Sequence, residues 1–278
     1  SPSRNPLLIL DREGRIICSF IGTPEDPEWA DIVAEAVAAM NKAREAGLRE
    51  NSFDRASRRH RRGTFFTLAG GVSHGGGQKV HPGMLVHSRS QRRLLMDLLN
   101  NKAIRRICGF QSSGFRTFGP KMFKQYVVTL KALFEHMPHL EHNFTNSVFP
   151  VVTFDLGPDS VTFEHLDFHN NPLGWCGITN GGAFDPKRSA HIYLKQLKLV
   201  IEFPPAASTL IPSAIIDHGN TPLAAGETRC SITQYAAGGL FRYVKYGFKT
   251  AEELLAQPGG RELKMKLDGE RGERPGWG

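Results

Sequence analysis

The second half of the chain contains a series of short apolar runs separated by glycine- and proline-rich turns. Runs of this length and spacing are typical of the strands of a β-sandwich or barrel. Helical patterns dominate the first half instead. We therefore predict an α+β fold with a double-stranded β-helix, or jelly-roll, core flanked by helices. The expected strands lie at residues 148–156, 161–163, 190–194, 197–203, 209–211, 214–216, 228–235 and 240–244.

The first half predicts a β-hairpin over residues 7–21 and then a helix. Asp26 precedes a proline, so it is the candidate N-cap of that helix, and Gly47 is the candidate stop. Two further helices are expected, from 90 to 108 and from 120 to about 137, the second with an apolar stripe that predicts core packing.

Composition fits an ordinary globular protein that can bury a full core, with 278 residues, 40% hydrophobic and 22% charged. No apolar run approaches the roughly 20 residues that span a bilayer. The four cysteines are far apart and form no C-x-x-C, which argues against a structural zinc site or a disulfide framework and favours a reducing compartment. The net charge of +8 favours a polyanionic partner such as nucleic acid, although solubility alone is the alternative.

The tripeptide that begins at His165 and ends at Asp167 is a candidate metal site, together with His218. Two histidines and one carboxylate hold iron(II) on one face and leave the other face open to substrate and oxygen. H-x-D alone is a weak signal. Here it lies between an expected strand and a loop, and His218 follows the expected strand 214–216.

An arginine opens the expected strand at 228–235, and alternate side chains from it share one face. That face carries Arg229, Ser231, Thr233 and Tyr235, so it is polar where a core face would be apolar. Arg229 could grip the distal carboxylate of 2-oxoglutarate at two points, with Ser231 adding a hydrogen bond. The pattern predicts an oxygen-activating iron enzyme that uses 2-oxoglutarate, with these candidate catalytic residues: His165, Asp167, His218 and Arg229.

A rival metal cluster is present at His136, His139, Glu141 and His142. Pro138 interrupts the helix there, and no arginine-bearing strand follows. Histidines that face solvent at a helix end are the better interpretation.

Two polar segments are candidates for substrate contact. The glycine-rich segment 70–79 follows an expected strand at 64–68, and its polar members are Ser73, His74, Gln78 and Lys79. Glycines allow close approach to a ligand, but a flexible surface loop is the alternative. The basic run 58–62 either contacts phosphates or is a solvated linker.

The region from about 62 to 250 resembles the TET/JBP family of nucleic-acid-modifying dioxygenases, and looks closest to its fungal branch. The resemblance rests on the combination of several segments. They are residues 62–71, 148–156, 174–176, 184–186, 199–204, His218 with Asn220, 226–229 and 234–239.

The resemblance implies an enzyme that oxidises 5-methylcytosine in DNA to 5-hydroxymethylcytosine and further oxidised forms, with the base flipped out of the duplex. Iron(II) would be held by the two histidines and the aspartate, and 2-oxoglutarate by Arg229, Ser231 and His191. The base would be contacted by Asn170, with His169 beside it, and stacked on Tyr235.

One departure from the family pattern keeps other activities open. Ala237 stands where animal relatives have a second base-reading histidine, so N6-methyladenine is an alternative substrate. An inactive DNA-binding module, oxidation of a small molecule or protein, and a zinc hydrolase are further alternatives.

We divide the chain into three parts. Residues 1–61 are an N-terminal hairpin and helix that pack on the core, with a basic linker. Residues 62–250 are the dioxygenase domain, and 251–278 are a partly disordered C-terminal tail. The expected partner is double-stranded DNA that carries a methylated base. We expect the protein to be a nuclear monomer that does not associate with a membrane.

Overall fold

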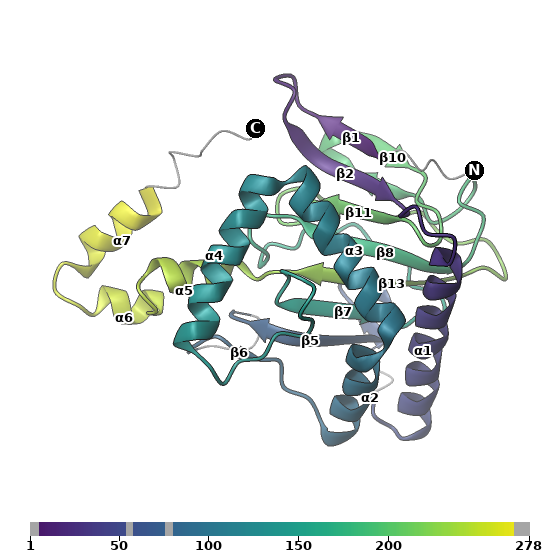
Figure 1. The fold of residues 1–278 in the computed structure, drawn as a ribbon, viewed down its shortest axis with the longest axis horizontal. Helices are drawn as coiled ribbons and strands as arrows, with labels where there is room; N and C mark the ends of the chain where they lie inside the picture. Colours follow the sequence, from purple (N-terminus) through teal and green to yellow (C-terminus); the bar gives the residue numbers. More distant parts are fainter. Residues whose placement is uncertain (1–5, 54–57, 76–79, 270–278) are drawn as a thin grey trace.

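The computed structural model describes residues 6–53, 58–75 and 80–269. Its centre is an antiparallel sheet with the strand order β1-β2-β11-β8-β13-β7-β5-β6 (Figure 1). A second sheet has the order β10-β9-β12. The strands of the large sheet are β1 (Leu7–Leu10), β2 (Ile16–Gly22), β5 (Thr67–Ser73), β6 (Gly83–Met84), β7 (Val151–Asp155), β8 (Cys176–Ala183), β11 (Ser208–Ile211) and β13 (Thr228–Tyr235). Those of the small sheet are β9 (Ile192–Leu194), β10 (Leu199–Ile201) and β12 (His218–Asn220). The predicted α+β class with a jelly-roll core is confirmed.

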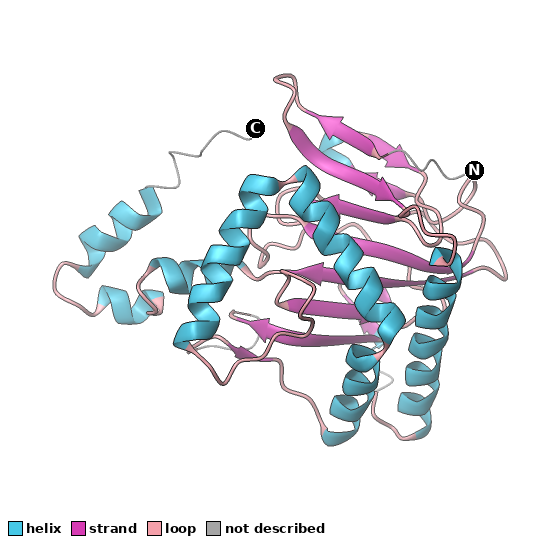
Figure 2. Cartoon of the chain, viewed as in Figure 1, coloured by secondary structure: helices cyan, strands magenta, loops and turns pink. Residues whose placement is uncertain are grey.

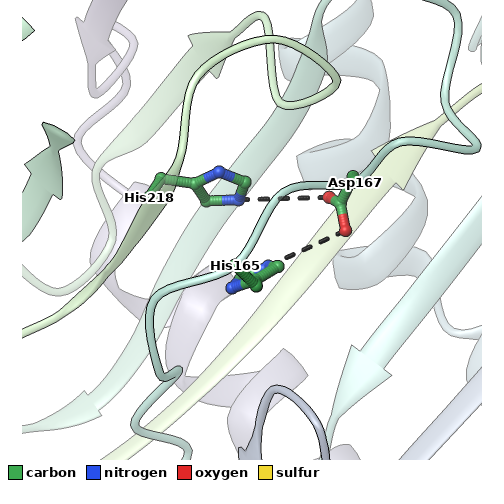
Figure 3. A group of neighbouring side chains, drawn as sticks. All are labelled: His165, Asp167 and His218. Carbon is green, nitrogen blue, oxygen red and sulfur yellow. Dashed lines mark ion pairs between the residues drawn. The ribbon is translucent and has the colours of Figure 1, made fainter. Parts of the chain in front are cut away.

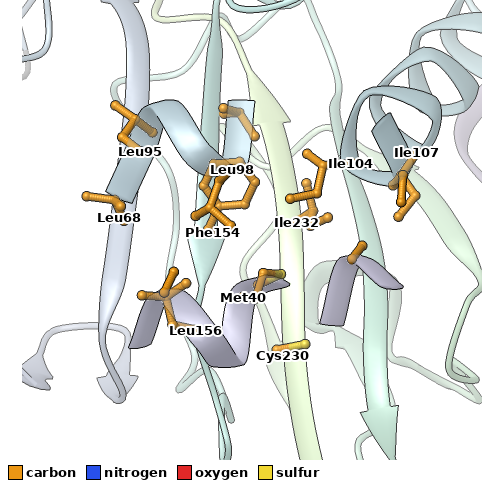
Figure 4. Packing of buried hydrophobic residues seen from close by; sticks show 14 of the residues in the cluster. Met40, Leu68, Leu95, Leu98, Ile104, Ile107, Phe154, Leu156, Cys230 and Ile232 are labelled. Carbon is orange, nitrogen blue, oxygen red and sulfur yellow. The ribbon is translucent and has the colours of Figure 1, made fainter. Parts of the chain in front are cut away.

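Helices cover the outer face of the large sheet (Figure 2). They are α1 (Trp29–Arg49), α2 (Arg89–Asn100), α3 (Lys102–Phe118) and α4 (Pro120–His136). Figure 4 shows Met40, Leu98 and Ile104 of these helices packed against Phe154 of β7 and Ile232 of β13. This apolar layer fixes β7 and β13 from behind, so their other faces can carry polar side chains.

The helix boundaries correct three predictions. The stretch 90–108 is not one helix, because Asn101 has extended geometry (ψ 127°) and its side chain accepts a hydrogen bond from Ile104 N at 2.9 Å. Asn101 thus caps α3. Gly47 does not stop α1, since it lies inside the helix where the Phe53 ring leaves no room for a Cβ. Asp26 is not the N-cap either, because α1 begins at Trp29.

The strand predictions were right at 7–21 and 228–235 and wrong at three other places. Residues 161–163 and 214–216 form no strand, and 240–244 belong to α5 (Gly238–Lys245). The central strand β8 was missed. Glycine has a low strand propensity, so the glycines of β8 gave no strand signal. In the structure, Gly181 packs directly against Val37 of α1.

The glycine-rich segment begins as a strand. β5 continues through Gly70 and Gly71 to Ser73. A Cβ at Gly70 would meet Leu95, and one at Gly71 (φ +119°) would meet the carbonyl of Pro150. Close packing, rather than loop flexibility, explains these two glycines.

The chain's two ends join the body in different ways. Strand β2 pairs with β11, and Trp29 Nε1 donates to Ala206 O at 2.9 Å. At the other end, the described part of the predicted tail contains two helices, α6 (Ala251–Leu255) and α7 (Gly260–Gly269). Residues 270–278 lie outside the described residues, and the three-part division remains a prediction. Along the described parts of the chain, none of the helices has the length and apolarity to cross a membrane.

Candidate functional site

His165, Asp167 and His218 come together at the edge of the small sheet (Figure 3). The backbones of His165 and His218 exchange two hydrogen bonds of 3.0 Å. Asp167 Oδ1 lies 3.7 Å from His165 Nε2, and its Oδ2 lies 3.9 Å from His218 Nε2. One donor atom from each of the three lies within 4.8 Å of the others, and no second such group occurs in the ranges that the structure describes.

The backbone holds both imidazoles in one tautomer. His165 Nδ1 donates to Phe163 O at 2.7 Å, and His218 Nδ1 donates to Ile216 O at 2.9 Å. Each Nε2 therefore presents its lone pair to the space shared with Asp167. Burial lowers the pKa of His165 to about 4 and also lowers the pKa of His218. Both rings are neutral near pH 7, which is the form that binds metal. This donor set fits iron(II).

Arg62 orients the carboxylate of the triad. Its Nη2 donates to Asp167 Oδ1 at 2.6 Å, while Arg61 Nη2 is 3.7 Å from the same oxygen. Burial alone would raise the pKa of Asp167, but Arg62 and the two histidines outweigh it, so that pKa is lowered. The carboxylate stays ionised. The basic run 58–62 thus includes a half-buried side chain, that of Arg62, which binds the triad.

A narrow cavity of about 50 Å³ extends from the triad between the two sheets. The predicted polar face of β13 lines it, through Arg229, Ser231, Thr233 and Tyr235. Ile192 of β9 lines it from the small sheet. The alternate side chains that were predicted to share one polar face of β13 therefore line the cavity.

Two cofactor candidates of that face already have partners. Arg229 is buried, and its Nη2 donates to Asn180 Oδ1 at 2.7 Å while its Nη1 donates to Ser160 O. Ser231 Oγ donates to Asp155 Oδ2 at 2.7 Å. Burial lowers the pKa of Arg229 to about 10 and raises the pKa of Asp155. Arg229 Nε is buried and has no partner among the described residues, so it is the donor left for an anion.

The other predicted contacts are scattered. Tyr235 lines the cavity, whereas Asn170 and His191 are not among its lining residues. The Asn170 amide donates to Ser213 Oγ at 3.0 Å, and His191 Nδ1 lies 3.1 Å from Thr221 Oγ1. His169 is exposed, and its ring lies 4.3 Å from that of Phe168. The substrate and cofactor roles of these residues remain predictions.

Residues 70–75, the part of the glycine-rich segment that the structure describes, do not line the cavity. Ser73 is buried at the end of β5, and His74 Nδ1 lies 3.3 Å from Gly239 O. Gln78 and Lys79 lie outside the described residues, so their predicted substrate contacts are not placed.

The rival cluster does not assemble. His136, His139, Glu141 and His142 are all exposed and form no metal-ligating group. The rings of His136 and His142 stack on Phe248 and Phe134 instead. The interpretation as histidines at a helix end is confirmed.

Sequence reasoning missed two charged residues of the cavity, Asp155 and Arg62. Asp155 is the single carboxylate in the apolar run 148–156, and a charge in such a run is a usable signal for a buried site. Arg62 is one of several arginines in a basic run, so nothing in the sequence distinguishes it from its neighbours.

No family model and no curated protein sequence matches this chain. Among solved structures, NgTET1 in complex with 5-methylcytosine DNA matches with a TM-score of 0.57 and 11% identity, over 84% of this chain and 77% of that chain. The chain shares the fold of NgTET1. The predicted TET-like resemblance is confirmed at the level of fold, while the fungal branch remains a prediction.

Two further solved structures match more weakly. AviO1 from Streptomyces viridochromogenes has a TM-score of 0.38 at 12% identity, over 83% of this chain and 96% of that chain. An oxidoreductase of the 2-oxoglutarate/iron(II) oxygenase family from Burkholderia pseudomallei has a TM-score of 0.33 at 15% identity, over 77% and 91%. The chain thus combines the fold of NgTET1 with a His-Asp-His group whose donor set fits iron(II).

Proposed function

We propose that the protein oxidises 5-methylcytosine in DNA as an iron(II)- and 2-oxoglutarate-dependent dioxygenase. The observation that carries the proposal is the joint placement of the His165–Asp167–His218 donor set and the buried Arg229 along one cavity. Arg229 and Ser231 would have no role in a zinc hydrolase that used the same three ligands.

Different residues along the cavity would have different roles. His165, Asp167 and His218 would hold iron, which supplies oxygen activation when it is bound. Arg62 keeps Asp167 ionised and oriented. Arg229 Nε and Ser231 would hold the distal carboxylate of 2-oxoglutarate. The cavity lies between the two sheets, which would limit the access of bulk water to a reactive site.

Three observations support DNA as the substrate. NgTET1, with the same fold, was solved with 5-methylcytosine DNA. The chain carries a net charge of +8, which suits phosphate binding. Phe168, next to Asp167, is 62% exposed, and the Arg61 guanidinium lies 5.4 Å from its ring. An aromatic and a cation beside the metal site suit an unstacked base and its backbone. The protein would act as a monomer in the nucleus on double-stranded DNA.

Ala237 favours one alternative substrate. It is buried, its backbone pairs with that of Asn170, and its methyl side chain offers no imidazole to a pyrimidine. N6-methyladenine is therefore the second candidate, attacked by the same iron chemistry.

The test is mass spectrometry of nucleosides after incubation with iron(II), ascorbate and 2-oxoglutarate. Paired duplexes would carry 5-methylcytosine or N6-methyladenine. We expect oxidised cytosine that disappears in His165→Ala. Loss of N6-methyladenine alone would select the second candidate. DNA binding without turnover of either base would point to an inactive binding module.

A further inference from the structure

Asp155 is a buried carboxylate inside the cavity, and the proposed chemistry does not use it. It is the last residue of β7 and lies opposite Ser231 in the β7–β13 pairing. Its side chain lines the same cavity as Arg229 and Ser231, and the residue is 9% exposed. The serine predicted to bind the co-substrate donates its hydrogen to Asp155 instead.

The positive charges near Asp155 do not neutralise it by direct contact. Arg229 on β13, Arg62 before β4 (Gly63–Thr64) and His60 on β3 (Arg59–His60) all act on it electrostatically. No cationic nitrogen of the described residues forms an ion pair with its carboxylate, and both Nη atoms of Arg229 serve Asn180 and Ser160. The carboxylate is thus held by one neutral hydroxyl, in a place where charge is costly.

A dicarboxylate at this end of the cavity meets Asp155 directly. Its distal carboxylate must approach Arg229 Nε and Ser231 Oγ, and Ser231 lies 2.7 Å from Asp155 Oδ2. A carboxylate that also contacts Ser231 therefore lies beside the carboxylate of Asp155. Two carboxylates that share one small site do not both stay ionised, because each raises the pKa of the other.

We propose that Asp155 is a binding residue for the co-substrate and acts as a carboxylic acid, taking up one proton when 2-oxoglutarate binds. This inference rests on the proposed function. The proton comes from solvent and resides on a carboxyl oxygen of Asp155, which donates a hydrogen bond to the incoming carboxylate. Ser231 is then free to turn its hydroxyl to the same carboxylate. No other bond forms or breaks, and no redox change occurs in this step.

The proton coupling has a measurable consequence. Above the pKa of Asp155 in the free protein, the affinity for 2-oxoglutarate should fall by about tenfold for each pH unit. Burial already raises that pKa, which lowers the cost of the uptake. The metal-bound histidines cannot contribute to this pH dependence, since a bound ion keeps their Nε2 atoms deprotonated.

The experiment is isothermal titration of 2-oxoglutarate into manganese-loaded protein, in two buffers of different ionisation enthalpy and at several pH values. The number of protons taken up follows from the difference between the buffers. We expect about one proton for the wild type and none for Asp155→Asn, with affinity nearly independent of pH in that variant. Asp159→Asn is the matched control, because Asp159 is an exposed aspartate bound by Arg58. It should behave as the wild type does.

Infrared spectroscopy gives a second readout. Addition of 2-oxoglutarate should produce the stretching band of a protonated carboxylic acid in the wild type and not in Asp155→Asn. Tight binding by the wild type without proton uptake or this band would overturn the assignment. Uptake that persists in Asp155→Asn would do the same. If manganese-loaded wild type and Asp155→Asn both failed to bind 2-oxoglutarate, the proposed function itself would fall.

Discussion

The two ends of the cavity are built in opposite ways. At the metal end, backbone carbonyls fix the two imidazoles, and their Nε2 atoms remain available to a ligand. At the distal end, Arg229 and Ser231 lie on a regular strand. Arg229 donates hydrogen bonds to Asn180 and Ser160, and Ser231 donates one to Asp155. Apart from Arg229 Nε, which has no partner among the described residues, the donors of this end must break an internal hydrogen bond to accept a ligand. Metal binding should therefore need little rearrangement, whereas co-substrate binding should need more.

Removal of a metal ligand should give the largest effect. In His218→Ala we expect manganese affinity to fall by more than about 100-fold, because two donors cannot enclose the ion. Titration followed by electron paramagnetic resonance would measure the affinity.

His139→Ala is the control for that experiment, since His139 belongs to the rival cluster and is exposed. The manganese affinity of His139→Ala should equal that of the wild type. A loss in His139→Ala of the same size as in His218→Ala would break the assignment of the metal end.

At the distal end, Arg229→Met should be the most damaging change. It removes the cation that acts most strongly on Asp155 and leaves Asn180 Oδ1 and Ser160 O without their donor. We expect the free energy of unfolding to fall by about 3 kcal/mol, because the buried Asp155 loses a nearby counter-charge and two buried oxygens lose their donor. Urea denaturation would measure it.

The double variant Arg229→Met/Asp155→Asn separates the two causes of that loss. If the uncompensated charge of Asp155 dominates, the double variant should recover about half of the lost stability. No recovery would mean that the hydrogen bonds of Arg229, rather than its charge, stabilise the distal end.

Arg62 supports the metal end through its hydrogen bond to Asp167. In Arg62→Gln we expect metal affinity to fall by about 10-fold to 100-fold, since partners of a metal ligand typically contribute this much. Arg61→Gln should change it by less than about threefold, because Arg61 is half exposed and 3.7 Å from Asp167 Oδ1. Equal effects in the two variants, measured by the same titration, would contradict the assigned role of Arg62.

The parts of the site that the sequence predicts are those with a periodic or local signal. The alternation of β13 predicts the face from Arg229 to Tyr235, and the H-x-D spacing predicts the first two ligands. Asp155 and Arg62 reach the cavity through pairing and loop closure, which involve residues far apart in the sequence. Strand β8 is defined by its neighbours on both sides rather than by its own propensity.

The smallest effect should be seen in the stability of Asp155→Asn as a function of pH. Burial raises the pKa of Asp155 above its unfolded value of 3.8, so the native state binds this proton more tightly than the unfolded state does. Native stability from this group is therefore fully present below that value and is lost as the pH rises through the native pKa. Asparagine keeps an oxygen for Ser231 but carries no charge. We expect Asp155→Asn to be more stable than the wild type at pH 7.5 by about 1 kcal/mol, the usual size of a single-residue effect. The difference should shrink as the pH approaches 4 in parallel urea titrations, and Asp159→Asn should show no such trend. A variant less stable than the wild type at every pH would show that the cations around the distal end already compensate this charge in the free protein.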